Sequence, residues 1–172
     1  MDDLPALGSD LCTQCGLCCA GALHDAADLY PEEVERARAL GLPVRPGPIT
    51  RFALPCPKLA GTVCTIYGDR PRVCGKYRCK LLRELEVGSV TFAEATARVA
   101  NAKQLVNSVE EAAGPDVTLP QMRALALQEI AQTSGPSKRR AMRIKLSAVA
   151  LALYLDKYFR NDRDGTIIKY QD

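Results

Sequence analysis

The 172-residue sequence contains a single histidine, His24, and no tryptophan. One histidine leaves few options for histidine-based acid–base catalysis, and no Ser-His-Asp set is present. The sequence also lacks a glycine-rich phosphate loop and a dinucleotide fingerprint. These absences argue against the common classes of hydrolase and nucleotide-binding protein. We expect His24 to be a surface histidine or one satisfied by its neighbours, in preference to a metal ligand.

Long apolar runs are absent as well. The first ten residues, MDDLPALGSD, are acidic and have no apolar core, whereas a secretory signal needs a positive start and a hydrophobic stretch. The most apolar run, Ser147 to Leu155, is too short to span a bilayer. We therefore expect a cytoplasmic protein that has no membrane partner.

An excess of charge of one sign is also missing, since 23 basic residues face 20 acidic ones. This balance does not by itself favour a nucleic-acid partner. The basic stretch from Ser137 to Lys145 has no interleaved aromatic residues, so we interpret it as a solvated helix face in preference to a nucleic-acid contact. The length fits one domain that can bury a core.

Cysteine, in contrast, is abundant, and all of it lies in the first half of the chain. In a reducing cytoplasm such a density points to metal or redox chemistry instead of disulfides. Inert buried thiols and a disulfide framework are the less favoured alternatives. The candidate metal ligands are Cys12, Cys15, Cys18, Cys19, Cys56, Cys64, Cys74 and Cys79.

The spacing of the first four cysteines indicates a metal site. Two residues between Cys12 and Cys15 let both sulfurs converge, because the intervening chain can turn tightly. Gly16 helps, since glycine tolerates positive φ and exposes N–H groups that can bond thiolates. The other four cysteines are widely spaced and must converge through folding. Basic residues near them would offset the thiolate charge: Lys58, Arg70, Arg72, Lys76, Arg78 and Lys80.

This pattern resembles the YkgJ-type CxxCxxCC family, whose members are described as zinc- or iron-chelating proteins. The resemblance covers Cys12 to Cys79 and implies metal binding. Some members are flagellin lysine N-methylases, which are longer chains thought to use a cluster and S-adenosylmethionine. The matching residues are Cys12, Cys15, Gly16, Cys18, Cys19, Cys56, Leu59, Gly61, Cys64, Ile66, Tyr67, Arg70, Pro71, Cys74 and Cys79.

The identity of the metal stays open between zinc and an iron–sulfur cluster. Four thiolates in a tetrahedral array suit zinc, and eight could hold two such ions. The C-x2-C-x2-C run with the remote Cys56-Pro57 resembles the run that holds a 4Fe-4S cluster in bacterial ferredoxins, although the fourth cysteine after three residues is missing. Tetrahedral thiolate sites suit both groups.

The neighbouring pair Cys18 and Cys19 predicts how the ligands divide. Adjacent side chains diverge, so both sulfurs cannot easily bind one tetrahedral ion. On a two-centre hypothesis, Cys18 joins Cys12, Cys15 and one distant cysteine, while Cys19 joins three of the later cysteines. The alternative is one centre with Cys19 free, as a redox or methyl-accepting thiol.

Three functions follow from these features. The leading hypothesis is a cysteine-rich metal-binding protein that holds zinc or an iron–sulfur cluster. The first alternative is a cluster-dependent, S-adenosylmethionine-using enzyme similar to the protein lysine N-methylases. The second alternative is a zinc-stabilised protein-interaction module. The expected partners are metal ions, with a protein partner or protein substrate beside them, and no residue is assigned a catalytic role.

The predicted fold is mainly α. Residues 1–85 should form a loop-rich, metal-organised region, and residues 86–172 a helical scaffold packed against it as one compact unit. Proline and glycine exclude long elements from the first region, apart from a short helix over Pro31 to Leu40 and another that begins at Pro71 and carries Cys74.

Three helices are predicted in the second region. Thr91 and Glu94 form a capping box before a helix over Phe92 to Ala113, and Thr118 with Gln121 caps the next. The third runs from about Ser137 to Arg160, and its middle, Ser147 to Leu155, is apolar on nearly all sides, which predicts a buried central helix. A short strand is expected over residues 166–170. The predicted core residues are Phe92, Val99, Val106, Leu125, Ile130, Leu146, Val149 and Leu153.

Overall fold

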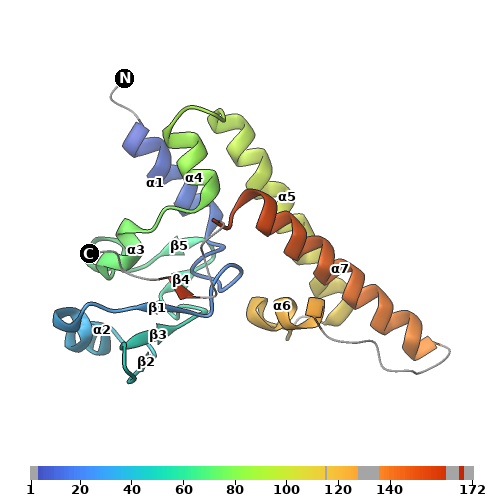
Figure 1. Cartoon of the computed structure of the whole chain (residues 1–172), viewed down its shortest axis with the longest axis horizontal. Helices are drawn as coiled ribbons and strands as arrows, with labels where there is room; N and C mark the ends of the chain where they lie inside the picture. Colours follow the sequence, from blue (N-terminus) through green and yellow to red (C-terminus); the bar gives the residue numbers. More distant parts are fainter. Residues whose placement is uncertain (1–3, 115, 128–135, 162–166, 169–172) are drawn as a thin grey trace.

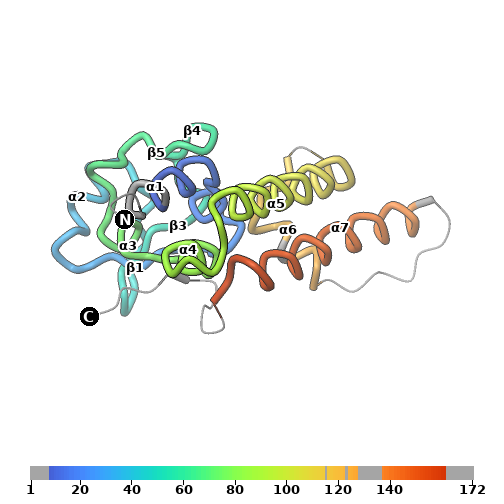
Figure 2. The backbone as a smooth tube through the Cα atoms, turned by 90° about the horizontal axis from the view of Figure 1, so that it is seen from above, coloured from blue at the N-terminus to red at the C-terminus, as the bar shows by residue number. Residues whose placement is uncertain are grey.

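The structure is a computed structural model that describes residues 4–114, 116–127, 136–161 and 167–168. It is mainly α-helical, as the sequence predicts. Figure 1 shows a loop-rich part with short helices and strands, formed mainly by residues 4–86, from which the helices of residues 92–158 extend as an arm. Seen from above in Figure 2, the arm leaves one side of this part. Within the described residues, no helix combines the length and apolar character needed to span a bilayer.

The loop-rich part contains four helices, two turns of 3-10 helix and most of the strands. Its helices are α1 (Leu4–Cys15), α2 (Val34–Ala39), α3 (Arg72–Lys76) and α4 (Lys80–Glu86), and its 3-10 turns are η1 (Pro31–Glu33) and η2 (Tyr67–Asp69). Its strands are β1 (Ala26–Asp28), β2 (Val44–Arg45), β3 (Arg51–Ala53), β4 (Leu59–Ala60) and β5 (Val63–Cys64).

Two small sheets organise this part. One has the order β2-β3-β1-β6, where β6 (Ile167–Ile168) runs parallel to β1 and the other pairs are antiparallel. The second sheet is the antiparallel hairpin of β4 and β5. The strand expected over residues 166–170 is therefore present at Ile167–Ile168, and its remaining residues lie outside the described part of the chain.

The arm contains the three predicted helices, α5 (Phe92–Ala113), α6 (Leu119–Leu127) and α7 (Pro136–Tyr158). The capping box at the start of α5 is confirmed, because the Thr91 N–H donates to Glu94 Oε2 at 2.7 Å and the Glu94 N–H donates to Thr91 Oγ1 at 3.2 Å. Thr118 and Gln121 make the same exchange at α6. The short helices at Pro31 and Pro71 are confirmed too, as η1 with α2 and as α3.

Helix α1 is a departure from the expectation, which placed loops around the first cysteines. The helix forms because Leu11 is buried against α4 and α5, at 3 % exposure. Tertiary packing therefore stabilises a segment whose own sequence gives a weak helical signal. The consequence for the site is that Cys12 and Cys15 lie on the last turn of a helix.

The main core joins α1 and α4 to the arm, and a smaller core fills the space between the four-stranded sheet, α2 and α3. The main core contains Leu11, Leu81, Leu85, Val99, Val106, Met122, Leu151, Leu155 and Phe159, among others. The proposed division into residues 1–85 and 86–172 stays a prediction.

The predicted core is only partly correct. Val99 and Val106 are buried, whereas Phe92, Leu125 and Val149 are half-buried. Leu146 and Leu153 are 61 % and 64 % exposed, so their assignment to the core is wrong, and Ile130 lies outside the described residues. Helix α7 carries apolar residues on two faces. Its neighbours α5 and α6 cover the face with Ala148, Leu151 and Leu155, and Phe159 is buried just after the helix, whereas Leu146 and Leu153 lie on the other face.

This orientation of α7 predicts the cost of truncating its leucines. Leu151→Ala should lower the free energy of unfolding by about 2 to 5 kcal/mol, because Leu151 is 3 % exposed and its truncation leaves a cavity. The matched control is Leu127→Ala on α6, where the side chain is 87 % exposed and the change should stay within about 0.5 kcal/mol. Equal losses in urea unfolding would contradict the assignment.

Candidate metal centre

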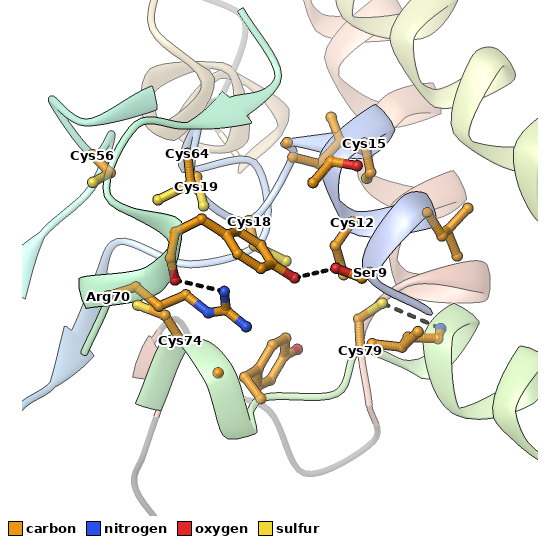
Figure 3. A pocket seen from close by; sticks show the side chains of 18 of the residues that line it. Ser9, Cys12, Cys15, Cys18, Cys19, Cys56, Cys64, Arg70, Cys74 and Cys79 are labelled. Carbon is orange, nitrogen blue, oxygen red and sulfur yellow. Dashed lines mark hydrogen bonds between the residues drawn. The ribbon is translucent and has the colours of Figure 1, made fainter. Parts of the chain in front are cut away.

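All eight cysteines line one cavity of about 610 Å³ (Figure 3). None of them is in a disulfide. They come from six segments of the chain, which lie between residues 12 and 79. Helix α1 supplies Cys12 and Cys15, the turn after it supplies Cys18 and Cys19, and the others come from the loop before β4 (Cys56), β5 (Cys64), α3 (Cys74) and the start of α4 (Cys79).

The turn after α1 depends on Gly16. Its φ is +68°, a left-handed conformation that favours glycine. A Cβ atom at this position would also lie 3.1 Å from Thr62 Cα, in the turn between β4 and β5. Glycine therefore lets the chain reverse and lets the β4–β5 hairpin approach. This reversal brings Cys18 and Cys19 to the cavity beside the end of α1.

The thiols fall into two groups of four, which we name here. The first thiol group is Cys12, Cys15, Cys18 and Cys79, because the charges of Cys79 and Cys15 raise the pKa of Cys18 and the charges of Cys15 and Cys12 raise the pKa of Cys79. The second thiol group is Cys19, Cys56, Cys64 and Cys74, because the neighbours that most raise the pKa of Cys19 are Cys56 and Cys64. The neighbouring thiolates that raise the pKa of Cys74 are those of Cys19, Cys56 and Cys64.

The adjacent residues Cys18 and Cys19 thus belong to different groups. Figure 3 shows Cys19 beside Cys64, with Cys12, Cys15 and Cys79 on the other side of the cavity. The Cys56 N–H donates to the Cys19 carbonyl oxygen at 2.8 Å, which joins two members of the second thiol group through the backbone. The groups are close, since Cys12 and Cys15 also raise the pKa of Cys19.

Burial dominates the electrostatics of these thiols. It raises the pKa of Cys15 to about 11 and, with the charges of neighbouring thiols, the pKa values of Cys19 and Cys79 to about 12. Burial also raises the pKa values of Cys18 and Cys74. The residue Cys12 is exposed at the cavity rim, yet burial of its thiol still raises the pKa. Ionised thiolates are therefore unfavourable here without a compensating positive charge.

Backbone N–H groups provide part of that compensation. The Leu82 N–H donates to Cys79 Sγ at 3.4 Å, so this thiol caps α4. The backbone of Leu17 lowers the pKa of Cys15, and the backbone of Lys58 lowers the pKa of Cys56. Hydrogen bonds of this kind favour the thiolate, which is the form that binds metal.

Arg70 provides positive charge between the groups. Its charge lowers the pKa of Cys12 in the first thiol group and of Cys74 in the second. The guanidinium lies 3.5 Å from the centroid of the Tyr67 ring and donates to the Tyr67 carbonyl oxygen at 2.8 Å. Arg78 and Lys58 also act on the thiols, on Cys12 and Cys56 respectively. Arg72, in contrast, pairs with Glu32 outside the cavity.

Tyr67 is a further residue of the site. It lines the cavity, and its hydroxyl lies 2.5 Å from the Ser9 hydroxyl on α1. The sequence signal for this place in the site was the cysteine motif, in which Tyr67 stands three residues before Arg70. His24, in contrast, lies outside the cavity wall and is fully buried, which excludes the surface position and leaves the expected alternative of a histidine satisfied by its neighbours. Its ring packs edge-on against Tyr77, with centroids 4.9 Å apart.

The cavity is larger than the space that one metal ion occupies. Across the described residues, no three Cys, His, Asp or Glu side chains lie close enough together to hold a single metal ion. Sulfurs that share one tetrahedral zinc ion lie about 3.8 Å apart, as the Zn–S distance requires. Thiols spread around a volume of about 610 Å³ suit an extended group with several attachment points.

One comparison with known proteins gives a match. Residues 11–104, more than half of the chain, match the family model CxxCxxCC, described as a "Putative zinc- or iron-chelating domain". The matched region contains all eight cysteines and extends into α5. No curated protein and no solved structure shows a match to the chain.

The raised pKa values predict a loss of stability at high pH in the metal-free chain. The folded chain holds thiol protons that the unfolded chain releases near the ordinary pKa of 9.0. This stabilising contribution is complete below about pH 9 and is lost as the pH rises toward the folded values of about 11 and 12. The urea midpoint of the reduced, metal-free chain should therefore fall above about pH 9.

The control is Cys18→Ser, since a serine hydroxyl does not ionise in this range. Its urea midpoint should depend less steeply on pH than that of the parent chain. A midpoint that rises with pH in the parent would show that the thiols are not buried as described.

Proposed function

Since the chain belongs to the CxxCxxCC family of metal-chelating domains, we propose that it holds two iron–sulfur clusters, one in each thiol group. The supporting observation is the large cavity in which the thiols do not converge on any single point. In a 4Fe-4S cluster each cysteine binds a different iron atom, so its four ligand sulfurs lie further apart than on one zinc ion. Eight thiols then suit two clusters with no ligand left over.

The surroundings support this choice of group. The walls of the cavity are mostly apolar, with side chains of Leu11, Leu17, Phe52, Leu81 and Leu82 among them. Backbone N–H groups and Arg70 offset the negative charge that thiolates and cluster sulfides carry. Hydrogen bonds, net charge and solvent exposure are also the factors that set the reduction potential of such clusters. When bound, two clusters would supply one-electron redox chemistry.

The proposed ligand set follows the grouping of the thiols. Cys12, Cys15, Cys18 and Cys79 would hold one cluster, and Cys19, Cys56, Cys64 and Cys74 the other. The methylase-like enzyme and the zinc-stabilised interaction module stay alternatives, and the identity of the bound group separates them. Methyl transfer with a cluster needs iron and sulfide, whereas the interaction module needs zinc alone.

Anaerobic purification of the full chain tests the proposal directly. The protein should be brown and contain about eight iron atoms and about eight acid-labile sulfides. A colourless protein with about two zinc ions and no sulfide would overturn the cluster proposal and favour the interaction module.

Two single substitutions test the division of the ligands. Cys18→Ser and Cys19→Ser should each lose about half of the iron and sulfide, because each removes a ligand from a different cluster. The double variant should retain almost none. Thr65→Ser, an exposed position in the neighbouring turn that lies outside the cavity wall, is the matched control and should retain all of it. Full iron retention in Cys19→Ser would refute the second cluster.

Removal of the metal should weaken the loop-rich part more than the arm. This part has short elements and a small core of its own, so the binding free energy adds to its folding free energy. Chelation under reducing conditions should lower the Tm and expose sites before Gly88 to protease while α5 stays protected. Unchanged protection of the loop-rich part without metal would contradict this dependence.

A further inference from the structure

Helix α7 has an apolar face that the described part of the chain leaves open. Met142, Leu146 and Leu153 are 39 %, 61 % and 64 % exposed, and Val149 beside them is half-buried. Large apolar side chains rarely gather on one exposed face without a partner. The opposite face of the same helix is already buried against α5 and α6.

The spacing along this face is that of a coiled-coil seam. Its apolar residues follow one another in steps of four, three and four residues. A further step of three residues at each end leads to a charged residue. Repeats of three and four residues place side chains in a single narrow line that a second helix can cover. The complete line is Arg139, Met142, Leu146, Val149, Leu153 and Asp156.

The two ends of the line carry opposite charges, which makes it complementary to itself. We propose that two copies of the chain form a dimer through antiparallel pairing of α7. The two-fold axis then passes between residues 147 and 148. Leu146 lies opposite the partner's Val149, and Met142 lies opposite the partner's Leu153. Arg139 then lies opposite the partner's Asp156. Each contact occurs twice, as a two-fold interface requires.

The residues that flank the line favour the antiparallel direction. Lys138, Arg139, Arg140, Arg143 and Lys145 all lie in the N-terminal half of α7. Parallel pairing would bring these cations together, which is unfavourable. Antiparallel pairing sets Arg143 near the partner's Ala150 and Lys145 near the partner's Ala152. These alanines are also small enough to let the two helices approach closely.

A second copy suits this face better than a membrane surface does. A helix that lies on an anionic membrane carries its basic residues along the whole polar border. Here five basic residues lie in the N-terminal half of α7, Lys157 follows only in its last turn, and the acidic Asp156 ends the line. The Asp156 side chain pairs with Arg160, two residues beyond the end of α7, but it is 55 % exposed and can accept a further donor. The line spans about 27 Å, at the rise of an α-helix.

The mass of the full chain in solution tests the proposal. Sedimentation equilibrium of the anaerobically purified, reduced protein should give a dimer, with intermolecular disulfides excluded by the reductant. Leu146→Asn combined with Leu153→Asn should weaken the dimer by at least about 100-fold, because both changes occur twice in the interface. Both side chains are exposed in the monomer, so the helix content should be unchanged. The matched control, Leu127→Asn on the exposed end of α6, should remain a dimer.

Charge reversal tests the register. Arg139→Glu and Asp156→Arg should each weaken the dimer about fivefold, and the combination should restore it, because the pair is then reversed. A chain that is monomeric at every concentration overturns the proposal, as does a double reversal that fails to restore the dimer. Binding of a monomeric chain to vesicles of anionic phospholipid, lost in the two Asn substitutions, would assign the face to a membrane instead and would also overturn it. The proposal does not depend on which metal group the cavity holds.

Discussion

The burial of eight thiols around one cavity is the constraint on which the rest of the structure depends. The thiolates of Cys15, Cys19 and Cys79 are disfavoured by burial and by neighbouring thiolates, as their raised pKa values show. Without metal the thiols keep their protons, and the cavity has little to hold its walls together. A metal group reverses this balance, because it favours the thiolate and links the six segments that carry the cysteines. Electrostatics and folding are therefore coupled at this site.

The surrounding elements serve to bring these segments together. Helix α1 ends at the cavity, Gly16 reverses the chain, and Cys79 caps α4 through the Leu82 N–H. The loop-rich part has only a small core of its own, whereas the main core joins α1 and α4 to the arm. The arm thus braces one wall of the cavity, and the metal group is expected to brace the other. Neither the short strands nor the short helices bury enough apolar surface to do so alone.

The sequence predicts the features that rest on local chemistry. The capping boxes at Thr91 and Thr118, the glycine turn at Gly16 and the divergence of Cys18 from Cys19 all follow from neighbouring residues. Helix α1 was missed because its stability comes from Leu11 packing against α4 and α5, which no local pattern reveals. The orientation of α7 was missed because apolar residues occupy both of its faces, so periodicity alone cannot decide which face is buried. The grouping of Cys79 with Cys12 required the tertiary fold.

Helix α7 connects the proposed dimer to the cavity. Its last turn leads to Phe159, which lies on the cavity wall and whose carbonyl oxygen accepts the Lys80 N–H at 3.0 Å. That bond lies directly after Cys79, a member of the first thiol group. The neighbouring Arg160 donates to the Ala22 carbonyl oxygen at 3.2 Å, in the segment that follows Cys18 and Cys19. A partner that orders α7 would therefore also steady two segments that carry thiols, so assembly and metal retention are expected to support each other.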